Sequence, residues 1–191
     1  MKKNLFISIW FTLATTVLLG IIYPLVVTGL AQMLFPKQAN GELIKQGDKL
    51  VGSHLIGQPF TAPGYFYSRP SAAGAAGYDP TASGGSNLGP TNKALINRVS
   101  ASVKALQPTN PAAPIPADLV TTSGSGLDPH ISPAAAEFQV PRVAHERGMS
   151  EQDIRALVQK HTEGRQFGLL GEPRVNVLDL NLDLDAIRPM H

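Results

Sequence analysis

The sequence has 191 residues, 43% of them hydrophobic, and this length fits one modest domain with a further segment rather than two full domains. The chain has no Cys, which excludes disulfides and thiolate metal sites. The formal net charge of +2 comes from Lys2 and Lys3, since the other basic residues match the 14 acidic ones in number, and this balance gives no support to nucleic-acid binding.

The first predicted element is a long uncharged run. Residues 4–36 contain no Asp, Glu, Lys, Arg or His, and about 20 apolar residues are enough to span a bilayer. A cleaved signal peptide, with cleavage after Ala31, is the alternative and would leave a free secreted binding protein. The apolar centre of a signal peptide is usually about 7 to 15 residues long, whereas residues 5–27 give a stretch of 23. We therefore predict a permanent transmembrane anchor over residues 1–36.

The orientation of the anchor depends on the basic residues near its two ends. The amino terminus precedes the span together with Lys2 and Lys3, and the span is followed by Lys37, Lys45 and Lys49. Basic residues close to a span favour the cytoplasmic side. Because two charges lie immediately before the apolar run, we expect a cytoplasmic amino terminus. Residues 37–191 would then form a domain outside the cytoplasm.

Within the span, small or hydroxyl-bearing residues recur at four-residue steps and form a row along one side of a helix, at Ser8, Thr12, Thr16 and Gly20. Small residues let a second helix approach closely, and hydroxyl groups can form hydrogen bonds across the interface. The row predicts a packing surface for a partner within the lipid bilayer, although such residues are also simply common in membrane helices. Pro24 lacks an amide hydrogen, so we expect a kink near Gly20.

The segment after the span begins with turns and a possible short strand at Lys49–Ile56. Residues 58–90 then show neither helical nor alternating periodicity. This segment is either a linker or an ordered functional loop. Its five aromatic residues favour order, because disordered segments are poor in aromatics.

A first helix of the domain is predicted after Thr91 or Asn92, either of which can cap it. Apolar residues then recur at steps of three and four, and Pro108 ends the pattern. Residues 111–116 are rich in Pro and predict an extended connector. A short strand is expected at Asp118–Thr122.

Two further helices and a strand complete the domain. Asp128 is predicted to cap the second helix, with Pro129 at its first position and a bend or interruption at Pro141. The third helix follows Ser150, which forms a capping-box pattern with Asp153, and we expect it to end at Gly164. Strict alternation over residues 174–184 predicts a strand with one buried face. The fold class is therefore a single transmembrane helix plus an α+β soluble domain with about three helices and a small sheet.

The candidate binding residues lie in two loops rich in Gly and Ser. One loop covers residues 83–87 and the other contains Ser123, Gly124, Ser125 and Gly126. Backbone amides in such loops can hold a phosphate group. Neither loop has the Gly-Lys-Ser/Thr ending of a phosphate loop or opens a helix, and tight turns alone explain the glycines.

Two other kinds of site are weakly indicated. Ser125, Asp128 and His130 have the residue types of a hydrolytic triad, but the Gly-x-Ser-x-Gly pattern is absent. We therefore predict no catalytic residue, although a membrane-anchored periplasmic hydrolase remains an alternative. No metal site is expected, because the His residues have no metal-ligand spacing. Arg69, which precedes Pro70, is either a partner contact or stacks on Tyr65 or Tyr67.

Long strings of this sequence resemble a known family. They are Tyr65-Phe66-Tyr67-Ser68-Arg69-Pro70-Ser71-Ala72, Tyr78-Asp79-Pro80, residues 83–92, residues 118–133 and Pro173-Arg174-Val175-Asn176-Val177-Leu178. Together they are similar to the C subunit of the bacterial Kdp potassium-transporting ATPase. The resemblance extends over nearly the whole chain, including the single span, and strings of this length are highly specific.

The resemblance implies an accessory subunit without catalytic activity of its own. It also implies a bacterial inner membrane, so that the expected domain of residues 37–191 would be periplasmic. Its implied partners are a channel-like potassium-translocating subunit, a P-type ATPase subunit and a small single-span subunit. Such a subunit is expected to assist assembly and to raise the affinity of the pump subunit for ATP, as a catalytic chaperone. No intrinsic cofactor is implied, and ATP enters only through the pump subunit. A domain outside the cytoplasm cannot touch cytoplasmic ATP, so the orientation that we prefer argues against direct nucleotide binding.

Overall fold

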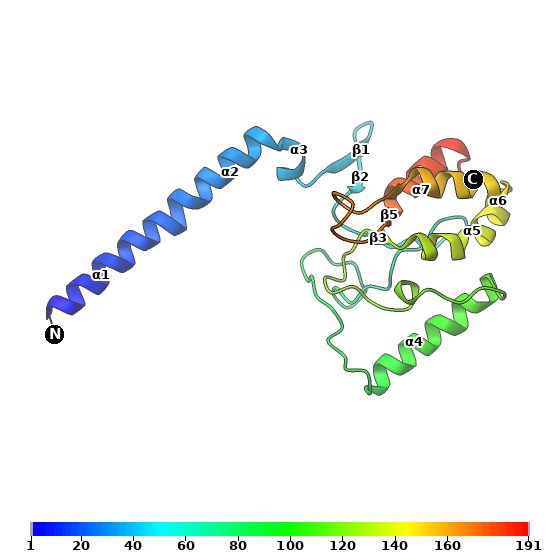
Figure 1. Ribbon diagram of the computed structural model, residues 1–191, viewed down its shortest axis with the longest axis horizontal. Coiled ribbons are helices and arrows are strands. Elements are labelled where there is room, and N and C mark those ends of the chain that lie inside the picture. Colours follow the sequence, from blue (N-terminus) through cyan, green and yellow to red (C-terminus); the bar gives the residue numbers. More distant parts are fainter. Residues whose placement is uncertain (1, 191) are drawn as a thin grey trace. The chain divides into compact units, whose positions relative to one another are not determined.

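The computed structural model describes residues 2–190, and the chain divides into two compact units, Met1–Val51 and Gly52–His191. The first unit is mainly a continuous helix, labelled α1, η1 and α2 in Figure 1. Its parts are α1 (Lys2–Val17), a π-helical turn η1 (Leu18–Ile22) and α2 (Tyr23–Leu34). A short helix α3 (Pro36–Ala39) and a two-stranded sheet of β1 (Leu43–Gln46) and β2 (Lys49–Ser53) follow.

The π-helical turn η1 includes Gly20, near which the sequence predicts a kink, and ends two residues before Pro24. A bend of the helix axis at this place stays a prediction. Pro24 has no amide hydrogen to donate. The preceding amide of Tyr23 donates to the carbonyl of Leu18, five residues back instead of four. A wider turn of this kind is a known way for a helix to adjust its hydrogen bonding locally.

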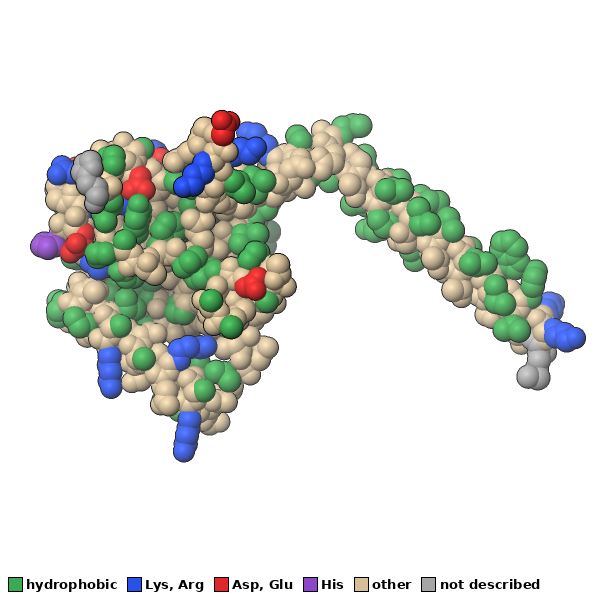
Figure 2. Space-filling view, turned by 180° about the vertical axis from the view of Figure 1, so that it is seen from behind, with side chains coloured by type: hydrophobic (Ala, Val, Ile, Leu, Met, Phe, Trp, Pro, Cys, Tyr) green, Lys and Arg blue, Asp and Glu red, His purple; other side chains and the backbone are tan. Residues whose placement is uncertain are grey.

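Among the described residues, one helix is long and apolar enough to cross a membrane, and it covers Lys2–Leu34. Its 33 residues exceed the roughly 20 that a bilayer requires. Figure 2 shows hydrophobic side chains along the whole visible length of this helix, with charged side chains only at its amino-terminal end. A helix that is hydrophobic all round, with none of its side chains buried by protein, fits a lipid environment.

Within the described residues, the second unit contains four α-helices and a small three-stranded sheet, as the sequence predicts for an α+β domain. Its longer elements are α4 (Lys93–Leu106), α5 (Pro133–Arg147), α6 (Glu151–Lys160) and α7 (Val177–Ile187), and its shorter ones are η2 (Gln107–Thr109), η3 (Ala117–Leu119), β3 (His130–Ile131), β4 (Thr162–Glu163) and β5 (Arg174–Asn176). The sheet has the order β3-β5-β4 and is antiparallel, with Val175 opposite both Ile131 and Thr162.

The core of this unit lies between α5, α6, α7 and the sheet, which are close together in Figure 1. Val175 on β5 and Leu180 on α7 are fully buried, as is Val143 on α5. The loop residue Phe66 is also fully buried in the same cluster. The aromatic segment of residues 58–90 is therefore an ordered loop that contributes to the core, which decides between the two alternatives left open by the sequence.

Two buried amide side chains hold this loop in place. Asn181 on α7 accepts from the amide of Phe66 at 2.9 Å and donates to the carbonyl of the same residue at 3.0 Å. Gln139 on α5 does the same for Tyr67, with distances of 2.7 and 3.2 Å. Buried backbone groups need such partners. The two amides therefore replace the hydrogen bonds that a neighbouring strand would otherwise supply.

Two predicted helices are confirmed at their starts. Asn92 caps α4 by accepting from the amide of Ala94 at 2.8 Å. Ser150 caps α6 and accepts from the amide of Asp153 at 3.1 Å. The predicted end of α6 at Gly164 is wrong, because the helix stops at Lys160 and the chain enters β4.

The region around the second helix differs from the prediction at three points. The strand expected at Asp118–Thr122 is wrong, since the 3-10 turn η3 lies there and Asp118 accepts from the amide of Ser132 at 2.7 Å. The helix begins four residues later than expected. Ser132, not Asp128, is the cap, and Pro133 takes the first position. The same cap-proline pattern occurs at both places, and pairing of residues 130–131 with β5 selects the second.

The helix also continues through Pro141, contrary to the predicted bend or interruption, and ends at Gly148 in the left-handed conformation. The missing amide at position 141 leaves the carbonyl of Glu137 without its usual donor, but Glu137 is exposed to water.

The predicted strand at residues 174–184 is mostly wrong. Only Arg174–Asn176 is a strand, and α7 follows it directly. Asn176 caps α7 by accepting from the amides of Leu178 and Asp179. The buried side chains of α7 include Val177, Asn181 and Leu184, which recur at helical spacing. The alternation of Leu and acidic residues is therefore compatible with a helix, and the cap at Asn176 decides the outcome.

Candidate functional site

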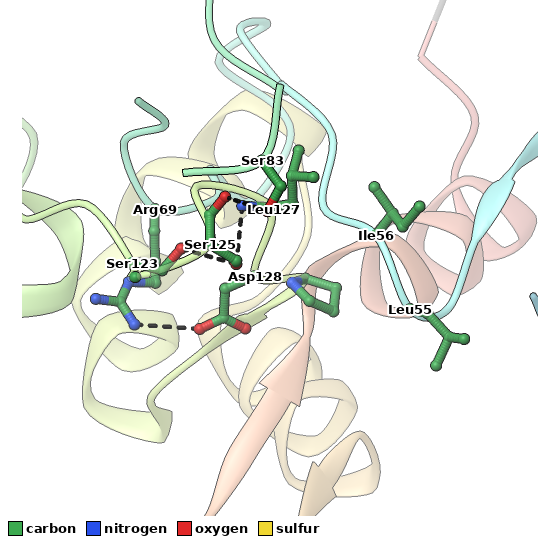
Figure 3. A pocket seen from close by; sticks show the side chains of 10 residues that line it. Leu55, Ile56, Arg69, Ser83, Ser123, Ser125, Leu127 and Asp128 are labelled. Atoms are coloured by element: carbon green, nitrogen blue, oxygen red, sulfur yellow. Dashed lines mark hydrogen bonds and ion pairs between the residues drawn. The ribbon is translucent and has the colours of Figure 1, made fainter. Parts of the chain in front are cut away.

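A pocket in the second unit, with both polar and apolar side chains in its lining, contains several of the loop residues that the sequence singles out. It has a volume of about 540 Å³ and is lined by Leu55, Ile56, Arg69, Ser83, Ser123, Gly124, Ser125, Leu127, Asp128 and Pro129. Figure 3 shows Arg69 pointing toward the carboxylate of Asp128, with Ser123 and Ser125 on the adjoining loop. The lining comes from four separate stretches of the sequence, at residues 55–56, 69, 83 and 123–129. Leu55, Ile56 and Pro129 had no signal in the sequence that would mark them as site residues.

The two Gly-Ser loops of the sequence lie against each other at this pocket. The amide of Gly84 donates to the carbonyl of Ser125 at 2.8 Å, and the hydroxyl of Ser83 donates to the same carbonyl at 3.1 Å. Gly126 has a φ of +68°, and a Cβ there would lie 2.6 Å from the carbonyl oxygen of Gly84. Glycine is thus required at position 126 by a tight turn and by the close approach of two backbones. This is the turn interpretation that the sequence left open beside phosphate binding.

Arg69, Asp128 and His130 form the charged centre of the site. Nη1 of Arg69 lies 3.1 Å from one carboxylate oxygen of Asp128, and Nη2 donates to the carbonyl of Thr122 at 3.3 Å. The other oxygen of Asp128 accepts from the amide of His130 at 3.0 Å and lies 3.4 Å from Nδ1 of its ring. Asp128 therefore acts in a turn and an ion pair, and not as the helix cap that the sequence predicts.

The pKa of Asp128 reflects these contacts. Burial by itself raises the pKa of this carboxyl, but the hydrogen bonds from His130 and the positive charge of Arg69 outweigh burial. The net result is a pKa below the usual range of an aspartate. Asp128 is consequently ionised at neutral pH and joins the loop of residues 123–130 to Arg69.

The lowered pKa predicts a loss of stability in acid. A group whose pKa is depressed by folding stabilises the native state above its unfolded pKa, about 3.9 for Asp, and that stabilisation disappears as the pH falls through the folded value. We expect Asp128→Asn to lower the urea midpoint of the chain in detergent at pH 7 and to have a much smaller effect near pH 2. Asp48→Asn, in an exposed turn, is the matched control. A difference between wild type and Asp128→Asn that stays constant with pH would contradict this role.

The structure does not assemble the hydrolytic triad considered for Ser125. The hydroxyl of Ser125 accepts from the amide of Leu127 at 3.1 Å and lies 3.5 Å from that of Ser123. Within residues 2–190 no hydrogen bond joins Ser125 to His130, whose ring instead faces Asp128. A nucleophile needs its base within hydrogen-bond reach, so this arrangement does not activate Ser125.

Anion binding is also poorly matched to this pocket. Arg69 is the cation that lines it, and its charge is already paired with the carboxylate of Asp128. A phosphate group would have to approach that carboxylate, and like charges repel. The ion pair between Arg69 and Asp128 therefore argues against a phosphate group at Arg69.

The structure also bears on the predicted stacking of Arg69 on Tyr65 or Tyr67. Within residues 2–190, the rings of Tyr65 and Tyr67 stack with other arginine residues than Arg69. The guanidinium of Arg142 lies 3.8 Å from the ring centre of Tyr67, and that of Arg147 lies 4.7 Å from the ring centre of Tyr65. In the described part of the chain, no group of three or more His, Cys, Asp or Glu residues is placed to hold a metal ion.

The membrane packing row lies on α1 and η1. The hydroxyl of Ser8 donates to the carbonyl of Leu5 at 2.9 Å, so it is satisfied within the helix. A Cβ at Gly20 would lie 3.9 Å from the methyl group of Thr16, which shows that the two positions are neighbours on the surface. Contact of Ser8, Thr12, Thr16 and Gly20 with a second helix stays a prediction.

A family profile and individual relatives both match this chain, and all of them are KdpC subunits of potassium-transporting ATPases. The profile of the KdpC family, described as the c chain of K+-transporting ATPase, matches residues 5–186. A potassium-transporting ATPase KdpC subunit of Koribacter versatilis is 63% identical over 190 residues, covering 100% of this chain and 98% of the relative. A subunit of the same description from Methylococcus capsulatus is 57% identical, covering 92% of this chain and 94% of the relative.

The match thus includes the apolar helix, the aromatic loop, the pocket segments and α7 in one alignment. The pocket alone would not have identified the chain, because its residues form no recognisable reaction centre. The length of the match, rather than any single residue, carries the assignment. The chain belongs to the KdpC family of potassium-transporting ATPase subunits.

Proposed function

We propose that this chain is a non-catalytic accessory subunit of an ATP-driven potassium uptake complex, which assists assembly and raises the ATP affinity of the pump subunit. Family membership is the observation that carries the proposal. Its partners are the channel-like subunit, the P-type ATPase subunit and a small single-span subunit. The Ser125 hydroxyl bonded to a backbone amide and the Arg69 charge paired with Asp128 agree with a role in contact rather than in chemistry.

A single helix favours an accessory role in transport. An ion crossing hydrocarbon needs an enclosed polar pathway, and one apolar helix cannot enclose one. The helix of Lys2–Leu34 instead offers a surface for other membrane helices. The second unit then supplies a rigid body, held together by a core of three helices and a sheet, that can press on a partner outside the membrane.

The effect on ATP affinity does not require direct nucleotide contact. A subunit changes the apparent ATP affinity of a partner when it binds the ATP-competent conformation more tightly than the others. A tenfold change requires a preference of about 1.4 kcal/mol. An interface of a few side chains can supply this amount, and the surface around Ser123–Pro133 is a candidate for it.

The location of the second unit can be tested with a single thiol. The chain has no Cys, so His145→Cys, at a side chain that is 85% exposed, introduces the only one. We expect it to react with an impermeant maleimide in intact spheroplasts, because Lys2 and Lys3 favour a cytoplasmic amino terminus. Asn4→Cys, which keeps both lysines, is the matched control and should react only after lysis. The reverse pattern would place the unit in the cytoplasm and make direct ATP contact the better hypothesis.

Assembly through the span is tested by adding bulk to the packing row. We expect Thr16→Leu and Gly20→Leu to reduce copurification of the two large subunits with the tagged chain, since an interhelical contact in a membrane contributes on the order of 1 kcal/mol. Val17→Leu and Leu18→Ile change neighbouring positions and should leave the yield unchanged. Equal recovery of the partners with all four variants would contradict a packing role for this row.

A further inference from the structure

The most exposed apolar residues of the second unit lie at the end of the hairpin that joins β4 to β5. The relative exposures are 93% for Phe167, 79% for Leu169 and 60% for Leu170, and these three residues are called the apolar tip here. The loop lies directly before β5 in Figure 1 and is coloured orange. Scattered exposed apolar residues are ordinary, but three bulky ones within four positions form a patch that indicates an interaction site.

The apolar tip is ordered by its own backbone. Gln166 and Leu170 exchange two amide-to-carbonyl hydrogen bonds, both of 2.9 Å. The amide of Gly168 donates to the carbonyl of Arg165 at 3.1 Å, which closes the turn. A tip that is already ordered loses little conformational entropy on binding.

Phe167 is held in an unusual conformation at this tip. Its φ is +54°, in the left-handed region that bulky residues rarely occupy. The flanking glycines Gly168 and Gly171 also have positive φ values. Backbone strain at a bulky residue persists when the surroundings enforce it, and it is commonly found at functional positions. Here the strained turn presents the aromatic ring to solvent instead of folding it into the core.

The charged residues on both sides of the apolar tip, called the hairpin stem, indicate what kind of surface covers the tip. Arg165 pairs with both carboxylate oxygens of Glu172 at 2.7 Å, and Arg174 pairs with Glu163 at 2.8 Å. The stem is therefore electrically balanced. Loops and helices that bind anionic lipid surfaces carry an excess of Lys and Arg beside their apolar residues. Such an excess exists elsewhere in this unit, on α4, which has Lys93, Arg98 and Lys104 and no acidic residue.

From this exposure, order, strain and charge balance we propose that the apolar tip docks into an uncharged apolar pocket on one of the larger subunits of the same complex. The inference rests on the proposed function, because it requires those partners. Phe167 and Leu169 are the anchors that enter the pocket, and the ion pairs of the stem form its polar rim. This is the usual arrangement of an interface in which a few buried apolar or aromatic side chains carry most of the affinity.

The position of the tip can be read from one environment-sensitive fluorophore. Leu169→Cys supplies the only thiol and can be labelled with nitrobenzoxadiazole while Phe167 is retained. We expect the label to be exposed when the chain is alone in nanodiscs and buried in the assembled complex, without quenching by spin-labelled lipid. Burial and lipid quenching in the chain alone would show that the tip enters the bilayer, and exposure in both samples would show that nothing covers it. Either result overturns the proposal.

A pair of substitutions tests the energetic role of the tip. We expect Phe167→Ser combined with Leu169→Ser to shorten the lifetime of the complex in detergent roughly tenfold, because both anchors are lost. The thermal unfolding of the chain itself should not change, since neither side chain is buried. Ile187→Ser, at another exposed apolar position of the same unit, is the matched control. An unchanged lifetime would refute the docking role, whereas failure of the wild-type chain to copurify would refute the proposed function itself.

Discussion

Phe66→Ala is expected to lower the free energy of unfolding by about 3 to 5 kcal/mol, the usual cost of truncating a fully buried aromatic side chain. Phe66 has no exposed surface and joins the aromatic loop to the core formed by α5, α6 and α7. Its loss leaves a cavity and also releases the segment that carries Arg69. Urea unfolding of the full chain in detergent, followed by circular dichroism, measures the change.

Phe167→Ala is the matched control for this experiment, because it removes the same side chain from a position that is 93% exposed. We expect its urea midpoint to stay within the range of ordinary surface substitutions, about 0.5 kcal/mol. A similar loss of stability for both variants would contradict the different roles assigned to the two aromatic residues.

Asn181→Leu is expected to be nearly as harmful, although the two side chains are similar in size. Asn181 is 1% exposed, and its amide satisfies both the N–H and the C=O of Phe66. Leucine leaves both groups buried without partners, at a cost of about 1 to 3 kcal/mol for each. Asn97→Leu, on the exposed surface of α4, controls for the exchange itself. Equal unfolding midpoints for Asn181→Leu and wild type would show that water can satisfy the N–H and C=O of Phe66 in place of the Asn181 side chain.

The predictions from sequence succeeded where the local signal agreed with the tertiary structure. Asn92 and Ser150 mark helix starts because each accepts a hydrogen bond from its own first turn. The long apolar helix of Lys2–Leu34 is equally local, since uncharged length alone defines it. Around Asp128 and Ser132 the same cap-proline signal appears twice, and only the pairing of β3 with β5 selects between them. That pairing joins residues 46 positions apart, which no local pattern reveals.

The site was less predictable for the same physical reason. Arg69 and Asp128 are 59 residues apart in the chain and meet only after both loops pack on the core. The Gly-Ser loops were recognised as turns, but their contact through Gly84 and Ser125 depends on the tertiary fold. The apolar tip had no signal at all, because exposure of Phe167 is a property of the folded hairpin and not of its sequence.

In the proposed function, the domain after the span acts on the partner subunits and thereby raises their ATP affinity. The most direct measurement compares ATP titrations of hydrolysis by the complex containing the full chain and by the complex containing residues 1–40 only. Both variants keep the span that supports assembly. We expect the half-saturating ATP concentration to be about tenfold higher without the domain, corresponding to about 1.4 kcal/mol of lost conformational preference. Identical half-saturating ATP concentrations in the two complexes would contradict a role of the domain in ATP affinity.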